Sequence, residues 1–255
     1  MRIMGLPFDD SMFQVDELES YPTARRWFPT CISHDRSARM SRESPSLEPK
    51  MLLDPISTYL QARRGEYDRI GASRLEVLTS LVDRLQEEIR RSNRAGIVFV
   101  CTHNSRRSHL AQLWTAATAF EHGLPIETWS GGTEATRFDH RAVASLTRAG
   151  FQIESVGDHA NAGYRVRFSP ATEPLHCLSK THDETPNPRV DFMAVMVCEE
   201  ADRGCPHLPG ATSRFAIPFE DPKLGDDTPE ETRIYDERCR EIAREMAWTV
   251  DMVAG

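Results

Sequence analysis

Residues 96–109, with the sequence GIVFVCTHNSRRSH, constrain the fold of this chain more than any other stretch. The apolar run at 97–100 has the length of a buried strand, and it ends in Cys101. A polar loop follows, and the sequence SHLAQLWTAATAF at 108–120 has helical character. We therefore expect a strand, a tight loop and a helix in that order, with Cys101 where the strand meets the loop.

The loop after Cys101 has the features of an oxyanion site. Unpaired N–H groups converge where a loop enters a helix, and the helix dipole favours negative charge there. Arg107 can hold two oxygens of a tetrahedral anion, and Ser108 can donate to the Cys101 sulfur or cap the helix. The same donors would stabilise the Cys101 thiolate as a nucleophile. The alternative is a buried cysteine beside a surface pair of arginines. The residues expected around the anion are Thr102, His103, Asn104, Ser105, Arg106 and Arg107.

The rest of the chain alternates apolar runs with helical segments. This alternation, with short turns, predicts an α/β fold with a parallel sheet. Ligand sites in such sheets lie at the carboxyl ends of the strands, where Cys101 and Ser130 are expected. Two glycines follow Ser130 and would let a neighbouring loop approach closely. The further strands of the sheet are expected at 126–130, 192–197 and 215–219, and the further helices at 140–149 and 228–253. The alternation at 164–168 predicts a strand of a small hairpin or of an irregular insertion.

Two more cysteines follow the strand expected at 192–197. The residues between Cys198 and Cys205, EEADRG, can form roughly two helical turns that keep the cysteines roughly 10 Å apart. A disulfide needs Cα atoms within about 7 Å, so a bond between them would require this segment to unwind. That behaviour suits a redox switch. The alternatives are two unrelated thiols or a zinc site with His207, for which the spacing is unusual.

Two polar segments are expected near the same edge of the sheet. Asp221-Pro222 is a turn after the last apolar run, and Asp221 is a candidate general acid if it lies beside the anion loop. The cluster at 179–183, SKTHD, is either a loop at the rim of the site or a solvated turn.

The first 95 residues divide into two parts. Residues 1–50 are rich in Pro, Ser, Arg and Asp without periodicity, and we expect them to be disordered. Asp54-Pro55 predicts the cap and first turn of a helix at 56–61, and the apolar residues of 71–92 recur at helical spacing. Residues 51–95 are therefore expected to form a helical extension that packs on the core. A partner-binding helix is the alternative.

Composition narrows the function further. The net charge of −8 argues against nucleic acid and anionic membranes as partners, because both attract basic surfaces. No run reaches the 18 or more apolar residues of a spanning helix, and the start of the chain lacks the pattern of a signal peptide. Six cysteines are too sparse for a disulfide framework in 255 residues. We expect a cytoplasmic protein with free thiols and no structural metal.

The order of these motifs resembles the low-molecular-weight protein tyrosine phosphatase superfamily, and within it the thioredoxin-coupled arsenate reductases. The resemblance runs from about residue 96 to the C-terminus, with an insertion near 155–185, and implies a catalytic domain over 96–255. It implies a flavodoxin-like fold, a four-stranded parallel sheet with helices on both faces. The motifs that carry it are Cys-x5-Arg-Ser at 101–108, Asp221-Pro222, and Cys198 and Cys205 followed by Pro206.

The resemblance implies two enzymatic mechanisms on one scaffold. In the first, Cys101 attacks arsenate held by the loop and Arg107, and Asp221 protonates the departing oxygen. Cys198 then attacks Cys101, Cys205 attacks Cys198, and thioredoxin removes the resulting disulfide. In the second, Cys101 forms a phosphocysteine from a phosphate ester and water hydrolyses it. A third hypothesis is a non-enzymatic anion-binding or redox-sensing module.

The resemblance also concerns a cofactor. No cofactor is required, but Asn104 and Ser130 are implied to support the loop and to border a potassium ion. Gln112 stands where the reductases often have Glu, which weakens the potassium assignment. His103 and Arg106 depart from the usual Gly and Cys of the family's loop. The sequence Lys-Leu-Gly at 223–225 replaces the paired tyrosines that frame a phosphotyrosine ring in the phosphatases.

Overall fold

Four apolar runs of the sequence form one parallel sheet. The computed structural model describes residues 51–157, 161–205 and 207–255, and the expectations for residues 1–50 lie outside them. The strands are β1 (Ala95–Cys101), β2 (Ile126–Gly132), β6 (Phe192–Met196) and β7 (Ala211–Ala216), in the order β2-β1-β6-β7. All three pairings are parallel. The predicted four-stranded parallel sheet is confirmed.

The last strand lies earlier than the sequence predicted. We expected it at 215–219, but β7 begins at Ala211 and ends at Ala216. The first residues of β7 are polar, which is tolerated in an edge strand with one partner. The apolar run used for the prediction therefore covers only the last residues of the strand. The backbone stays attached to β6 beyond the strand, because the N–H groups of Ile217 and Phe219 donate to the carbonyls of Met196 and Val197.

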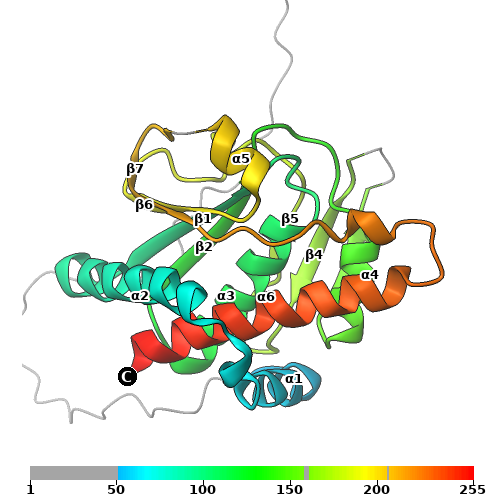
Figure 1. Ribbon diagram of the computed structural model, residues 1–255, viewed down its shortest axis with the longest axis horizontal. Coiled ribbons are helices and arrows are strands. Elements are labelled where there is room, and N and C mark those ends of the chain that lie inside the picture. Colours follow the sequence, from blue (N-terminus) through cyan, green and yellow to red (C-terminus); the bar gives the residue numbers. More distant parts are fainter. Residues whose placement is uncertain (1–50, 158–160, 206) are drawn as a thin grey trace, which may run out of the picture. The chain divides into compact units, whose positions relative to one another are not determined.

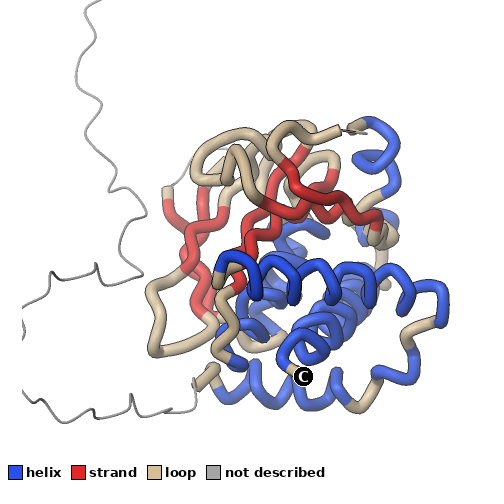
Figure 2. The backbone as a smooth tube through the Cα atoms, turned by 90° about the vertical axis from the view of Figure 1, so that its left-hand side faces the viewer, coloured by secondary structure: helices blue, strands red, loops and turns tan. Residues whose placement is uncertain are grey.

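Helices cover both faces of this sheet, as the fold class predicted. Helix α3 (Arg107–His122) connects β1 to β2 and packs on α6 (Glu231–Ala254). The short helix α5 (Glu199–Gly204) connects β6 to β7 in the opposite direction, so right-handed crossovers put it on the other face. Figure 1 shows α5 above the strands and the long helices below them, and Figure 2 shows the long helices gathered beside the strands from a second side.

The segment before β1 forms helices that pack on α6. Helix α1 (Asp54–Arg64) is followed by a 3₁₀ turn, η1 (Tyr67–Arg69), and by α2 (Ala72–Ser92). Leu53, and not Asp54, occupies the N-cap position of α1, because the helix begins one residue earlier than its Asp-Pro signal suggested. Both α1 and α2 contact α6, and their fully buried side chains include Ile56, Leu60, Leu78 and Leu85.

Residues between β2 and β6 form a second, antiparallel sheet that the sequence only partly indicated. After α4 (His140–Arg148), strands β3 (Gln152–Val156), β4 (Gly163–Arg167) and β5 (Leu175–Cys177) pair in the order β3-β4-β5. The chain then returns to the main sheet, where residue 181 bridges to the end of β2. This return brings residues 179–182 to the carboxyl edge of the sheet. In the described ranges, no helix has both the length and the apolar character that crossing a membrane requires.

Candidate active site

The anion loop lies between β1 and α3, and its sulfur and hydroxyl face each other. Cys101 is buried at the end of β1, and its Sγ lies 3.2 Å from the Oγ of Ser108. The amide of Asn104 donates to the same Oγ at 2.9 Å, which leaves the Ser108 proton for the sulfur. The side chain of Arg106, the N-cap residue of α3, makes no capping hydrogen bond. The first N–H groups of α3 therefore point toward the loop, as an oxyanion site requires.

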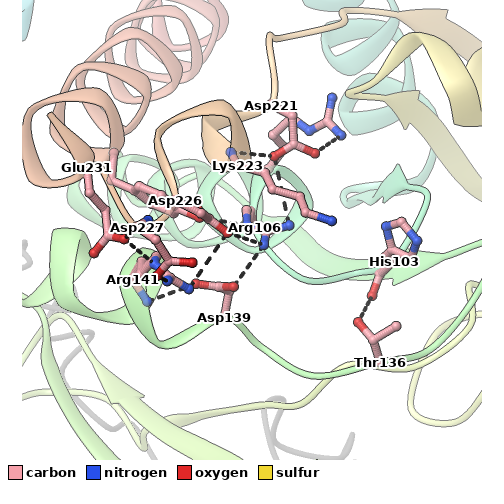
Figure 3. A network of polar contacts seen from close by, with 12 residues as sticks. His103, Arg106, Thr136, Asp139, Arg141, Asp221, Lys223, Asp226, Asp227 and Glu231 are labelled. Carbon is pink, nitrogen blue, oxygen red and sulfur yellow. Dashed lines mark hydrogen bonds and ion pairs between the residues drawn. The ribbon is translucent and has the colours of Figure 1, made fainter. Parts of the chain in front are cut away.

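Residues from the second half of the chain hold the loop from outside. Asn104 has a φ of 43°, a left-handed conformation that asparagine tolerates, and its Oδ1 accepts a hydrogen bond from the N–H of Lys180 at 3.0 Å. The hydroxyl of Ser179 donates to the carbonyl of His103 at 2.8 Å, and Thr136 donates to the same carbonyl (Figure 3). The segment at 179–183 is thus at the rim of the site, one of the two alternatives left open by the sequence.

Gly132 allows the end of β2 to lie against the loop. A Cβ on this residue would lie 2.7 Å from the carbonyl O of Thr102 and 2.8 Å from the amide N of Asn104. The next two residues donate backbone hydrogen bonds to the carbonyls of Cys101 and Thr102. The glycine therefore does what the sequence suggested, because it lets two backbones approach without a side chain between them.

Arg107 and Asp221, which are 114 positions apart, meet beside the loop. Arg107 is buried at the start of α3, and its Nη2 donates to the Oδ2 of Asp221 at 2.6 Å. Its Nη1 donates to the carbonyl O of Phe219 at 2.9 Å. Asp221 caps the 3₁₀ turn η2 (Pro222–Gly225) and keeps part of its carboxylate exposed. The arrangement puts a carboxylate and a guanidinium at one end of the cysteine loop.

The side chain of Arg106 joins several carboxylates around the loop, including Asp221, whose Oδ1 lies 3.9 Å from its Nη1. Its Nε donates to the hydroxyl of Tyr235 at 2.8 Å, and its Nη2 donates to Asp139 at 2.9 Å and lies 3.5 Å from Asp226. Figure 3 shows its guanidinium between these carboxylates. Arg106 was predicted among the anion-binding residues; in the structure its side chain ties the loop to the start of α4, to the carboxylates around η2 and to α6.

Cys198 lies next to the loop and Cys205 does not. The Sγ of Cys198 is 3.5 Å from the hydroxyl of Thr102 and accepts from the N–H of Ala201 at 3.3 Å, so it caps the N-terminus of α5. Burial raises the pKa of the Cys198 thiol, although these two hydrogen bonds and Arg107 oppose the change. Cys205 is at the other end of α5 and is partly exposed. The helix therefore separates the two thiols.

Ser130 contacts α3 instead of the loop. Its hydroxyl lies 3.1 Å from Nδ1 of His109, and its carbonyl accepts from Asn187 at 2.9 Å. His109 is fully buried, and burial, with the nearby ammonium of Lys180, lowers its pKa well below 6.5. Ser130 thus supports the site through α3 and through Asn187, whose amide also donates to the carbonyl of His182 at the rim.

The residues present do not fit the potassium ion that the resemblance implied. The side-chain oxygens of Asn104 and Ser130 already have protein partners, and the positive charge of Lys180 is close by. The Oε1 of Gln112 and the Oδ1 of Asn187 are buried without a partner, but these two amide oxygens alone do not make a cation site. Within residues 51–157, 161–205 and 207–255, no group of three or more His, Cys, Asp or Glu side chains could hold a metal ion.

Three contacts of the site were not indicated by the sequence. Ser179 and Lys180 bind loop residues 76 positions earlier, so the contact exists only because the second sheet returns the chain there. Phe219 acts through its carbonyl O, and every residue has a carbonyl. Only the polar composition of 179–183 was a signal, and it did not distinguish the rim of the site from a turn.

Comparison with known proteins identifies relatives of this chain. No family model matches the sequence. Arsenate reductase 2 of Staphylococcus epidermidis is 28% identical over 141 residues, which cover 55% of this chain and 88% of that protein. An arsenate reductase of Bacillus anthracis is 27% identical over 153 residues, which cover 60% and 94%.

Solved structures give more distant matches. A low-molecular-weight protein tyrosine phosphatase from T. tengcongensis matches with 19% identity and a TM-score of 0.39, over 62% of this chain and 96% of that one. The thioredoxin-dependent arsenate reductase Cg_ArsC1' of Corynebacterium glutamicum matches with 18% identity and a TM-score of 0.35, over 76% and 84%. The chain is thus similar in sequence to arsenate reductases over more than half of its length, and its Cys-x5-Arg-Ser loop lies between β1 and α3.

Proposed function

We propose that this protein is an arsenate reductase in which Cys101 is the nucleophile and Cys198 and Cys205 carry the oxidation away. The observation that carries the proposal is the contact of the Cys198 sulfur with the hydroxyl of Thr102, the residue next to Cys101. A phosphatase needs no second thiol at this point. Similarity to proteins named arsenate reductase supports the choice of substrate.

The first step forms a bond between sulfur and arsenic. Arsenate binds to the N–H groups of the loop and takes the Nη2 of Arg107 from Asp221, while Nη1 keeps its bond to the carbonyl of Phe219. The Cys101 thiolate attacks arsenic, one arsenic–oxygen bond breaks, and Asp221 donates the proton with which that oxygen leaves as water. Arsenic remains pentavalent in the product.

The second step moves two electrons. The thiolate of Cys198 attacks the sulfur of Cys101, and the sulfur–arsenic bond breaks with its electron pair on arsenic, which leaves as trivalent arsenite. The two cysteines are oxidised together to a disulfide, so the electrons balance. Cys205 then attacks Cys198, which frees Cys101. Because α5 separates Cys198 from Cys205, this exchange requires α5 to unwind. A dithiol protein such as thioredoxin reduces the Cys198–Cys205 bond.

A phosphatase of the same family is the second candidate. The contact of Arg107 with Asp221 beside the loop favours it, because both groups serve hydrolysis of a phosphocysteine without Cys198. The substrate would lack an aromatic clamp, since Leu224 is exposed where the phosphatases carry tyrosines. The third candidate, a non-enzymatic module, predicts neither activity.

Three cysteine variants separate these candidates. Arsenite release with thioredoxin and its reductase is measured beside hydrolysis of p-nitrophenyl phosphate, for the wild type and for Cys101→Ser, Cys198→Ser and Cys239→Ser. We expect Cys101→Ser to abolish both activities. Cys198→Ser should lower arsenate turnover more than about 100-fold and keep hydrolysis.

Cys239→Ser is the control. Cys239 is buried in α6, where its sulfur accepts from Trp114, and serine keeps that acceptor. It should leave both activities near the wild-type level. Normal arsenate turnover without Cys198 would refute the reductase mechanism, and wild-type protein with neither activity would favour the non-enzymatic module.

A further inference from the structure

A residue of the N-terminal helices contacts the segment that holds Arg107. Arg74 lies in the first turns of α2, upstream of residue 96, where the resemblance to the arsenate reductases begins. We infer that Arg74 is a positioning residue: it fixes the backbone at Pro218 and Phe219, and through the carbonyl of Phe219 it aims Arg107 at the anion. The inference deepens the proposed function and rests on it for the identity of the anion.

The guanidinium of Arg74 contacts residues 218 and 219 in two ways, by a hydrogen bond and by stacking on an aromatic ring. Its Nη2 donates to the carbonyl O of Pro218 at 2.9 Å. Its guanidinium carbon lies 4.5 Å from the centroid of the Phe219 ring, a cation–π distance. Two successive residues are thus held by one side chain, just after β7 has ended at Ala216.

Phe219 passes this restraint to the site. Its carbonyl O accepts from Nη1 of Arg107 at 2.9 Å, and its N–H donates to the carbonyl of Val197 at 3.1 Å, one residue before Cys198. When an anion displaces Asp221 from the other nitrogen of Arg107, the hydrogen bond to Phe219 remains, together with a longer contact of 3.9 Å between Nη1 and the exposed carboxylate of Glu200. A displacement of about 1 Å at a catalytic group can lower the rate about 100-fold. Movement of the backbone at Phe219 would therefore shift the Arg107 guanidinium and weaken its contact with the anion.

Glu245 fixes Arg74 in turn. The Nε of Arg74 donates to the Oε2 of Glu245 at 2.7 Å, and only 5% of the Glu245 side chain is exposed. Removing Arg74 alone would leave a buried carboxylate without its partner, which destabilises a protein for reasons unrelated to Arg107. The test therefore changes both residues together and compares them with Glu245→Gln alone, which keeps the guanidinium on Pro218 and Phe219.

The test measures anion binding without turnover. Inorganic phosphate protects a cysteine in an anion loop from iodoacetamide, and the half-protecting concentration reports affinity at Cys101. In the full chain, we expect Arg74→Met/Glu245→Gln to raise this concentration about tenfold and to lower kcat/KM for arsenate by about 100-fold. Glu245→Gln should stay within about twofold of the wild type, as should Arg84→Met, which removes another α2 arginine from its ion pairs with Glu87 and Glu88.

The outcomes show whether Arg74 positions Arg107 or only stabilises the fold. An unchanged half-protecting concentration in the folded double variant, judged by its circular dichroism, would overturn the inference. If the wild type itself fails to reduce arsenate but the half-protecting concentration still rises in the double variant, the role of Arg74 is supported and the proposed substrate is refuted. If the double variant does not fold, Arg74→Lys replaces it, because lysine keeps the charge opposite Glu245 but loses the planar stacking on Phe219. That variant should raise the half-protecting concentration, and no rise would again overturn the inference.

Discussion

Two thiols beside the same loop lie in different surroundings. Cys101 faces the hydroxyl of Ser108, whereas burial raises the pKa of Cys198 above its ordinary value of 9.0. A thiol attacks only after losing its proton, so the thiolate fraction of Cys198 increases as pH rises toward that raised pKa. We predict that formation of the Cys101–Cys198 disulfide accelerates about tenfold per pH unit between pH 7 and pH 9.

Quenched single-turnover release of arsenite measures this step. Hydrolysis of p-nitrophenyl phosphate, which does not need Cys198, is the control and should not follow the same curve. Arsenite release that is independent of pH in this range would contradict the attack by a buried thiol.

A second prediction for a single residue concerns His109 and the pH dependence of the free energy of unfolding. Burial and the ammonium of Lys180 lower the pKa of His109 well below 6.5, so the unfolded chain binds a proton that the folded chain does not. Stability is therefore lost as pH falls below about 6.5, by up to about 2 kcal/mol at pH 5. His109→Gln removes the imidazole that binds this proton in the unfolded chain. Urea unfolding at both pH values should show a smaller loss for the variant, and equal losses would show that His109 does not titrate on unfolding.

At the scale of the element, the contact between the end of β2 and the anion loop depends on a missing side chain. A Cβ at Gly132 would meet the carbonyls of Thr102 and Glu134 and the amide of Asn104, all backbone atoms that cannot turn aside. We predict that Gly132→Ala displaces the loop and lowers kcat/KM more than about tenfold. Gly71→Ala is the matched control, since nothing lies within 4 Å of a Cβ there. Full activity of Gly132→Ala would show that the loop does not depend on this contact.

The elements also show what the sequence could predict. Strands β1, β2 and β6 lie within two residues of their predicted positions, because their apolar runs are bounded by polar loops. Strand β7 was predicted four residues too late, because its first half is polar at the edge of the sheet. Only β4 of the second sheet was expected, at 164–168, since β3 and β5 are short and largely polar.

Some features of the candidate site could be predicted from local sequence, and others depend on the path of the chain. The spacing from Cys101 to Ser108 is local, so a loop and a helix start are readable in it. Asp221 was expected beside the anion loop only on the assumption that both lie at one sheet edge, and in the structure its carboxylate contacts Arg107. The support from Lys180 depends on the path of the second sheet, which no local pattern encodes.

At the scale of the whole molecule, one carboxylate joins the N-terminal helices to the core. Asp251 of α6 accepts from Arg64 at 2.8 Å and from Tyr67 at 2.6 Å, and it lies 2.7 Å from Nε2 of His122. We predict that Asp251→Asn lowers the free energy of unfolding by about 2 kcal/mol, because the half-buried guanidinium of Arg64 keeps only its ion pair with Glu121 and Tyr67 loses a charged acceptor. Phosphate protection of Cys101 should not change, since this contact does not reach the site.

Asp236→Asn is the matched control for this prediction. Its pair with Arg148 is formed by side chains that are 38% and 42% exposed, so it should contribute less than about 0.5 kcal/mol. Urea unfolding of both variants makes the comparison. Equal losses of stability would mean that Asp251 does not hold the helices more firmly than a surface pair.

In the proposed mechanism, Cys101 and Cys198 act on one arsenic atom. The most direct test treats the reduced Cys205→Ser variant, which should stop after the second step, with arsenate and no reductant. We expect one arsenite to be released per chain, and a tryptic fragment in which Cys101 is disulfide-bonded to Cys198. Arsenite without that disulfide, or arsenate left unreduced by a folded chain, would contradict this mechanism.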